Sequence, residues 1–234
     1  MIKRELYMNR IRPFIGGELI KVMTGIRRSG KSVMLELIKE ELAEAGVAPS
    51  QMISINFEDM RYSHLQTATA LHDEIIKRAE GIEGKAYLFF DEIQEVEGWE
   101  KCVNSLRVAL DCDIYITGSN AKLLSGELAT YIGGRYVEFV IYPFSFAEFL
   151  ELYHTIAPSD SIQQCFQKYL LAGGMPYLAN LRYEEEPSRQ YLTDLFNSVQ
   201  LKDIVKRNKI RDIDLLERII AYMTANVGTV FSAS

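Results

Sequence analysis

The chain has 234 residues, of which 48% are hydrophobic and 25% are charged, and its formal net charge is −6. This composition supplies enough apolar residues for a core, and it excludes wholesale disorder and a generally basic nucleic-acid binder. No apolar stretch reaches the roughly 18–20 residues of a membrane helix and no apolar region follows the charged start, so we expect a cytoplasmic protein without membrane contact. The three cysteines form no Cys-x-x-Cys pair, which favours reduced thiols.

Short apolar runs alternate with helical patterns in the first part of the chain, which is typical of an α/β fold with a mainly parallel sheet. Five strands are predicted, at residues 19–24, 52–57, 86–90, 114–117 and 136–141. Helices are predicted between them, at residues 31–45, 65–79 and 99–110. Five strands with helical crossovers form one nucleotide-binding domain, which we place at residues 1–150.

From Phe146 onward the pattern changes to helices without a convincing strand. The predicted helices cover residues 146–153, 162–171, 191–205 and 213–223. Turns rich in Pro, Gly or Glu separate them, among them residues 173–176 and 184–187. The sequence therefore predicts a helical, lid-like extension over residues 151–234.

A phosphate-binding loop is predicted directly after the first strand, because residues 25–32 fit G-x-x-x-x-G-K-[ST] at every fixed position. Glycines let the loop curl so that backbone N–H groups point at phosphate oxygens, and the following helix adds its positive end. Lys31 is predicted to reach the β- and γ-phosphates and Ser32 to ligate Mg²⁺. A glycine-rich turn with an exposed lysine does not explain both residues. The predicted nucleotide contacts are Gly25, Arg27, Arg28, Ser29, Gly30, Lys31, Ser32 and Val33.

An acidic pair, Asp91-Glu92, ends the third strand. The carboxyl ends of parallel strands meet at one edge of the sheet, so we expect this pair beside the phosphate loop. Asp91 is predicted to hold the hydration shell of Mg²⁺, and Glu92 to polarise the attacking water as general base. The alternative is an acidic pair that begins a solvated loop. Asn56, at the end of the second strand, is predicted to hydrogen-bond Glu92 and restrain it.

Polar residues also follow the fourth strand and precede the fifth. Ser119 or Asn120 is predicted to contact the γ-phosphate or the attacking water, and a helix N-cap with a turn fits both residues equally well. Arg135 is predicted to bring positive charge to the γ-phosphate, in this chain or in a neighbouring subunit. A surface arginine at the end of a loop is as good an interpretation.

These residues together resemble a widespread prokaryotic family of predicted AAA+-type ATPases, which join an ATPase core to a C-terminal domain of unknown function. The matching segments span most of residues 1–205 and are 23–32, 90–94, Trp99, 116–120, 134–135, 143–149 and 173–176. The resemblance implies an additional-strand P-loop fold with the strand order 5-1-4-3-2. It also implies ATP rather than GTP, and the sequence has no Asn-Lys-x-Asp guanine motif to contradict this.

Members of this family are usually much longer than this chain. The resemblance implies that the helix over residues 213–223 leads into a winged-helix-like segment, and the sequence stops at Ser234 within that pattern. We therefore expect a C-terminally truncated product, in which the absent portion is an alternative place for a DNA contact.

The sequence leaves three functions open. The first is a Mg²⁺-dependent ATPase in which hydrolysis of ATP to ADP switches the helical region and acts on an unknown partner, with oligomerisation left open. The second is a DNA-associated regulatory or effector module, because basic residues cluster between Lys202 and Arg211; a solvated helix face explains them too. The third is phosphotransfer to another acceptor, for which no acceptor site is visible.

Overall fold

The computed structural model describes residues 2–118, 132–199 and 212–229. The chain divides into two compact units, Met1–Tyr183 and Glu184–Ser234. The first unit thus contains residues 151–183 of the predicted extension together with residues 1–150. Hydrogen bonds connect these two parts, because the backbone N–H of Phe144 donates to Gly174 O and Tyr169 Oη donates to Phe144 O.

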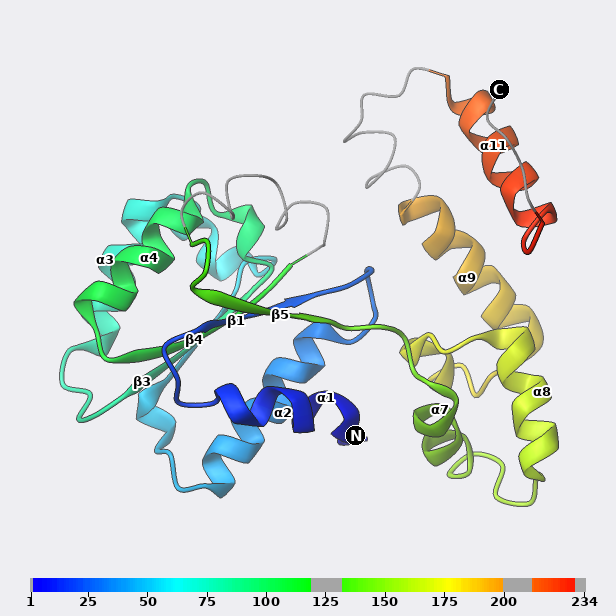
Figure 1. The fold of residues 1–234 in the computed structure, drawn as a ribbon, viewed down its shortest axis with the longest axis horizontal. Helices are drawn as coiled ribbons and strands as arrows, with labels where there is room; N and C mark the ends of the chain where they lie inside the picture. Colours follow the sequence, from blue (N-terminus) through cyan, green and yellow to red (C-terminus); the bar gives the residue numbers. More distant parts are fainter. Residues whose placement is uncertain (1, 119–131, 200–211, 230–234) are drawn as a thin grey trace. The chain divides into compact units, whose positions relative to one another are not determined.

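A five-stranded parallel sheet forms the centre of the first unit (Figure 1). Its strands are β1 (Ile20–Thr24), β2 (Met52–Asn56), β3 (Ala86–Asp91), β4 (Cys112–Thr117) and β5 (Tyr136–Val140). The order across the sheet is β2-β3-β4-β1-β5, and every neighbouring pair is parallel. This confirms the predicted order, in which β4 lies between β1, which precedes the phosphate-binding loop, and β3, which ends at Asp91.

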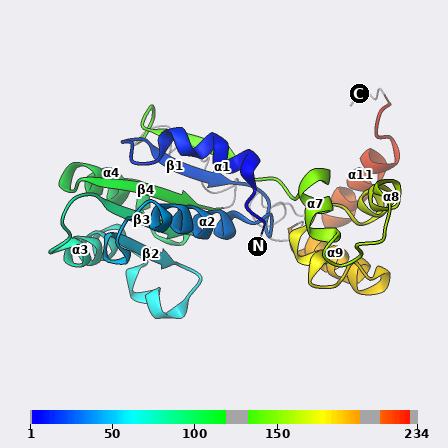
Figure 2. The ribbon, with the colours of Figure 1, turned by 90° about the horizontal axis from the view of Figure 1, so that it is seen from below.

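Helices cover both faces of this sheet, which explains why β1 is buried along its whole length. One face packs on α1 (Glu5–Ile11) and α2 (Lys31–Glu44), through a core that includes Ile11, Ile38 and Phe139. Figures 1 and 2 show these two helices on the same side of the strands. The opposite face packs on α3 (Ala68–Ala79) and α4 (Trp99–Ala109). Short 3₁₀ helices connect the layers: η1 (Arg12–Phe14), η2 (Pro49–Gln51), η3 (Met60–Leu65) and η4 (Ile93–Glu95).

The rest of the first unit consists of α7 (Phe146–Tyr153), α8 (Ile162–Ala172) and the 3₁₀ helix η5 (Pro176–Ala179). An aromatic cluster holds them together. The ring centroid of Phe149 lies 5.1, 5.2 and 5.0 Å from those of Tyr153, Tyr169 and Tyr183. Rings at these separations pack favourably beyond the apolar area that they bury. Phe149, Tyr153 and Tyr183 are buried, so these rings form a small core of their own.

The second unit contains α9 (Glu185–Val199) and α11 (Ile213–Ala225) among its described residues. The sequence predicted that α9 begins at residue 191, after a turn marked by Pro187. The prediction was wrong because Pro187 lies in the first turn of the helix, where a backbone N–H has no intrahelical partner and its loss carries no penalty. The basic cluster from Lys202 to Arg211 lies outside the described residues.

Two elements before residue 80 also differ from the prediction. The helix predicted from residue 65 begins at Ala68, because the side chain of Thr67 accepts a hydrogen bond from Ala70 N and caps it. The helix α1 was not predicted at all.

In the described part of the chain, none of the helices combines the length and the apolar character needed to cross a membrane.

Candidate nucleotide site

The loop between β1 and α2 requires glycine at two positions. Gly25 has φ 143°, and a Cβ atom at this residue would lie 2.2 Å from the carbonyl oxygen of Ile141. Gly30 directly precedes α2 with φ 100°, in the left-handed region that favours glycine. Arg28 adopts φ 62° between them. The backbone therefore curls tightly at the start of the helix, as the sequence pattern predicts.

Lys31 is buried at the first position of α2, with a side chain that is 5% exposed. Its ammonium donates to two carbonyl oxygens of the loop, Gly25 O at 3.3 Å and Ile26 O at 3.2 Å. Burial lowers the pKa of Lys31 from its ordinary value, and the nearby charges of Glu92 and Asp91 oppose this shift. A buried ammonium that is held by neutral carbonyls is suited to an anionic ligand such as phosphate.

Asp91 ends β3 and is fixed by hydrogen bonds from both neighbouring strands. Asn56 Nδ2 donates to Asp91 Oδ2 at 3.0 Å, and the Thr117 hydroxyl donates to Asp91 Oδ1. Asn56 and Asp91 are register partners in the parallel ladder of β2 and β3. The predicted bond from Asn56 to Glu92 is therefore wrong, because the register places the amide beside the preceding carboxylate.

Glu92 directly precedes η4 and has a left-handed backbone, φ 55° and ψ 46°. Its N–H donates to Thr117 Oγ1 at 3.0 Å. Its carboxylate Oε1 lies 3.9 Å from Lys31 Nζ, and Oε2 accepts a hydrogen bond from Gln94 Nε2. The carboxylate is thus held between the phosphate-loop lysine and Gln94. The role of Gln94 was not predicted, although the residue stands only two positions after the acidic pair.

A cleft of about 570 Å³ opens over the loop and Glu92, which is within the range of small-molecule sites. Its lining residues are Arg27, Arg28, Gly30, Lys31, Ser32, Val33, Glu58, Glu92, Pro176, Tyr177 and Asn180. Arg27 approaches Glu58 at 3.9 Å on one rim. The residues of η5 come from the segment after α8 and were not predicted as site residues. The signal that could have indicated them was the Gly173–Pro176 segment, which is one of the segments that carry the family resemblance.

Other predicted site residues are not brought into this cleft. Arg135 lies at the amino end of β5, where its carbonyl accepts from Ile20 N at the start of β1 and its guanidinium donates to Asn104 at 2.7 Å. The phosphate loop lies at the opposite end of β1, about 16 Å away for five residues of strand. Arg135 therefore does not reach the site of its own chain. Ser119 and Asn120 lie outside the described residues.

The oxygen atoms around the loop fit a magnesium ion that is bound together with a nucleotide. Mg²⁺ prefers oxygen ligands and keeps several waters, so one hydroxyl and one oriented carboxylate suffice beside substrate phosphates. Ser32 lines the cleft and Asp91 is fixed at the adjacent strand end. Within residues 2–118, 132–199 and 212–229, no group of three or more His, Cys, Asp or Glu side chains forms a metal cluster.

Sequence comparison places matches over nearly the whole chain. Residues 18–150 match a family model described as an AAA domain, and residues 163–234 match a domain of unknown function, DUF8612. An uncharacterized protein of Haemophilus influenzae is 40% identical over 100% of this chain. The uncharacterized protein MJ1544 of Methanocaldococcus jannaschii is 33% identical over 88% of it. The matches span 58% and 47% of the lengths of these two relatives.

Comparison with solved structures gives a similar fold at low sequence identity. A RuvB mutant from Thermotoga maritima matches with a TM-score of 0.51 and 16% identity, over 97% of this chain and 77% of that one. This likeness concerns the arrangement of helices and strands alone.

Proposed function

We propose that this chain, which belongs to the AAA domain family and has the fold of AAA+ P-loop ATPases, binds ATP with Mg²⁺ and hydrolyses it. One observation carries the proposal. Lys31 of the phosphate loop and the carboxylate of Glu92 face each other at 3.9 Å in a cleft large enough for a nucleotide. A buried cation for phosphate and an adjacent base for water are the two groups that hydrolysis of a phosphoanhydride requires.

Binding uses the loop and the first turn of α2. The backbone N–H groups around Gly30 and the positive end of the helix attract the phosphates. Lys31 exchanges its bonds to the carbonyls of Gly25 and Ile26 for phosphate oxygens, which satisfy its charge better than neutral acceptors. Ser32 and Asp91 are the residues that hold Mg²⁺, which supplies charge neutralisation on the phosphate oxygens when it is bound.

Hydrolysis uses Glu92 as the general base. Its carboxylate accepts a proton from the attacking water, and Gln94 keeps one of its oxygens in place during this transfer. Lys31, 3.9 Å from the other oxygen, keeps the carboxylate close to the γ-phosphate. Positioning of these groups supplies most of the catalysis, because phosphoryl transfer needs little covalent chemistry from the protein.

Two substitutions separate binding from hydrolysis. Lys31→Ala is expected to abolish ATP binding in a calorimetric titration, because the cleft loses its buried cation. Glu92→Gln is expected to bind ATP with affinity close to the wild type and to hydrolyse it about 10²–10⁴ times more slowly. Lys39→Ala is the matched control, since Lys39 lies on the same helix and pairs with Glu36 at 2.7 Å. Wild-type turnover by Glu92→Gln would refute the assignment of the base.

Contacts with macromolecules are further parts of the proposal. The proposed binding of DNA through Lys206 and Arg207 is tested by measuring DNA binding, and ATP turnover with and without duplex DNA, at several salt concentrations. The wild type is compared with a variant in which the charges of both residues are reversed.

Arg135 would act on a neighbouring copy, and Arg135→Ala would then lower turnover only at protein concentrations where copies associate. The same turnover at every protein concentration would count against that role.

A further inference from the structure

Arg4 is a buried arginine that the ATPase chemistry described above does not use. Its side chain is 1% exposed, although it stands almost at the start of the chain. Its guanidinium lies over the rings of Tyr7 and Phe144, with centroids at 4.6 and 5.1 Å. The backbone of Arg4 is left-handed, φ 48° and ψ 47°, which is uncommon for a residue with a side chain. A buried, strained arginine requires partners that account for it.

One group of partners lies on the phosphate loop. Arg4 Nη1 donates to the carbonyl oxygen of Ser29 at 3.0 Å, and it would lie 3.4 Å from a Cβ atom placed on Gly30. A trans peptide is planar, so the N–H of Gly30 points away from the Ser29 carbonyl and therefore away from Arg4. Arg4 thus fixes the orientation of one of the amides that line the cleft.

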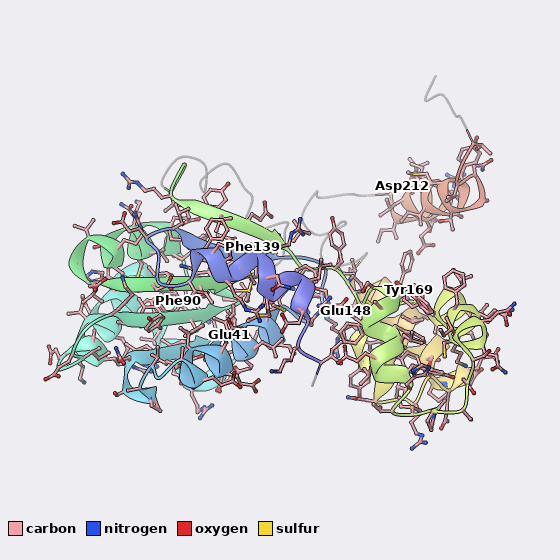
Figure 3. The ribbon with its side chains drawn as sticks, turned by 60° about the horizontal axis from the view of Figure 1, so that its bottom comes forward. Glu41, Phe90, Phe139, Glu148, Tyr169 and Asp212 are labelled. Atoms are coloured by element: carbon pink, nitrogen blue, oxygen red, sulfur yellow. The ribbon has the colours of Figure 1, made fainter. Side chains whose placement is uncertain are left out.

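The other partners lie where the chain leaves the sheet for α7. Arg4 Nη2 donates to Tyr142 O at 2.8 Å, and Arg4 Nε donates to Glu148 Oε1 at 2.8 Å. Glu148 also closes the capping box of α7, since its Oε2 accepts from the backbone N–H of Ser145 at 2.8 Å. Figure 3 labels Glu148 on α7. A single guanidinium therefore joins the phosphate loop to the start of this helix.

The segment around Phe144 continues this connection to the cleft. The N–H of Phe144 donates to Gly174 O at 2.7 Å, and Tyr169 Oη donates to Phe144 O at 2.9 Å. The contact at Gly174 is so close that a Cβ atom would lie 2.1 Å from Phe144 O. Gly174 stands two residues before η5, which brings Tyr177 into the cleft.

We infer that Arg4 is a positioning residue that sets the phosphate loop and η5 at a fixed separation around the bound nucleotide. Arginine is required because its five donors form a planar fork, which reaches the loop carbonyl, the Tyr142 carbonyl and a carboxylate at the same time. A lysine keeps the charge but not this geometry. The inference rests on the proposed binding of ATP in the cleft, and it adds a residue that contacts no part of the nucleotide.

The test is a double-mutant cycle on ATP affinity, measured by calorimetry with the full chain, Mg²⁺ and ATP. Arg4→Lys and Tyr177→Ala are each expected to weaken binding about tenfold, which corresponds to about 1.4 kcal/mol. The double variant is expected to bind nearly as well as either single variant, because Tyr177 is no longer held over the loop once Arg4 is replaced. Additive losses would overturn the inference.

Two further variants keep the test valid if Arg4→Lys unfolds. Glu148→Gln preserves the capping box, in which glutamine also serves, but it removes the charge that Arg4 pairs with. It is expected to show the same non-additivity with Tyr177→Ala. Arg12→Lys is the control, because Arg12 pairs with Glu5 and Glu41 away from the cleft. It is expected to change ATP affinity less than twofold and to add to Tyr177→Ala.

The outcomes distinguish the inference from the proposed function. If the wild-type chain does not bind ATP, the proposed function fails and the inference fails with it. If the wild type binds ATP and the Arg4 and Glu148 cycles are additive, the function stands and the inference is overturned. The same coupling with Arg12→Lys would indicate a general loosening of the fold, which also overturns the inference.

Discussion

A buried ion pair between β1 and β4 gives a quantitative test of the fold. Lys21 and Asp113 both have fully buried side chains and form a hydrogen-bonded pair. Asp113 Oδ2 also accepts from Gly16 N and from Tyr115 Oη, each at 2.7 Å. The ammonium of Lys21 further lies 4.7 Å from the centroid of the Tyr115 ring. Each charge therefore depends on the other, and the pair also anchors the turn before β1.

Removal of either partner leaves the other charge buried without its counterion. Lys21→Met leaves a carboxylate with two neutral donors, and the expected loss in the free energy of unfolding is about 3–5 kcal/mol. Asp113→Asn leaves a buried ammonium beside a neutral amide, and a loss of similar size is expected. The double variant has no buried charge at this position, so we expect its loss to be at least about 2 kcal/mol smaller than the sum of the single losses.

Urea unfolding followed by tryptophan fluorescence measures these losses directly. The chain has one tryptophan, Trp99, which is 4% exposed on α4 and therefore reports on the unit that holds the pair. Lys85→Met is the control, because the pair of Lys85 with Asp111 is partly exposed and is expected to contribute less than about 1 kcal/mol. Single losses below about 1 kcal/mol, or additivity within about 0.5 kcal/mol, would show that the two buried charges do not depend on each other.

Substitutions at Gln94, Cys102 and Gly174 test the site and the core. Gln94→Leu is expected to lower kcat about tenfold without changing KM for ATP, because Gln94 contacts Glu92 and does not line the cleft. A parallel rise of KM in steady-state kinetics would contradict this prediction. Burial raises the pKa of Cys102 from 9.0 to about 12, so the folded thiol stays protonated above pH 9 while the unfolded one ionises. The free energy of unfolding should therefore fall as pH rises above 9. Between pH 8 and 10.5, the free energy of unfolding measured in urea should fall by about 2 kcal/mol less for Cys102→Ala than for the wild type. Gly174→Ala is expected to weaken ATP binding about tenfold, since its Cβ atom collides with Phe144 O and displaces η5; unchanged affinity would show that η5 does not contact the nucleotide.

The features that the sequence predicted correctly are those that depend on neighbouring residues. An apolar run such as the one that contains Phe89 and Phe90 indicates a buried strand, because the whole pattern lies within a few consecutive positions. The loop at residues 25–32 is predictable for the same reason, since its glycines, lysine and serine stand at fixed positions within eight consecutive residues. The strand order came from the resemblance, because pairing of distant strands leaves no local pattern.

The features that were missed depend on contacts between distant residues. Arg4 and Glu148 are separated by 144 positions, and nothing in either neighbourhood indicates the other. Asn56 was correctly expected at the end of its strand. The carboxylate that its amide bonds is set by the register of β2 and β3, which the sequence of a single strand cannot reveal. Arg135 was expected at the phosphate although it precedes its strand, and parallel strands place their starts at the opposite edge from the site.

The left-handed backbone of Glu92 means that folding and chemistry make opposite demands on one position. A residue with a Cβ atom costs about 1–2 kcal/mol in this conformation, whereas glycine and, to a lesser degree, asparagine tolerate it. A library of all substitutions at residue 92, ranked by resistance to proteolysis, should therefore place glycine or asparagine above the natural glutamate. The same library ranked by ATP turnover should place glutamate first. Glutamate at this position is then a mark of selection for activity that selection for stability alone would erase.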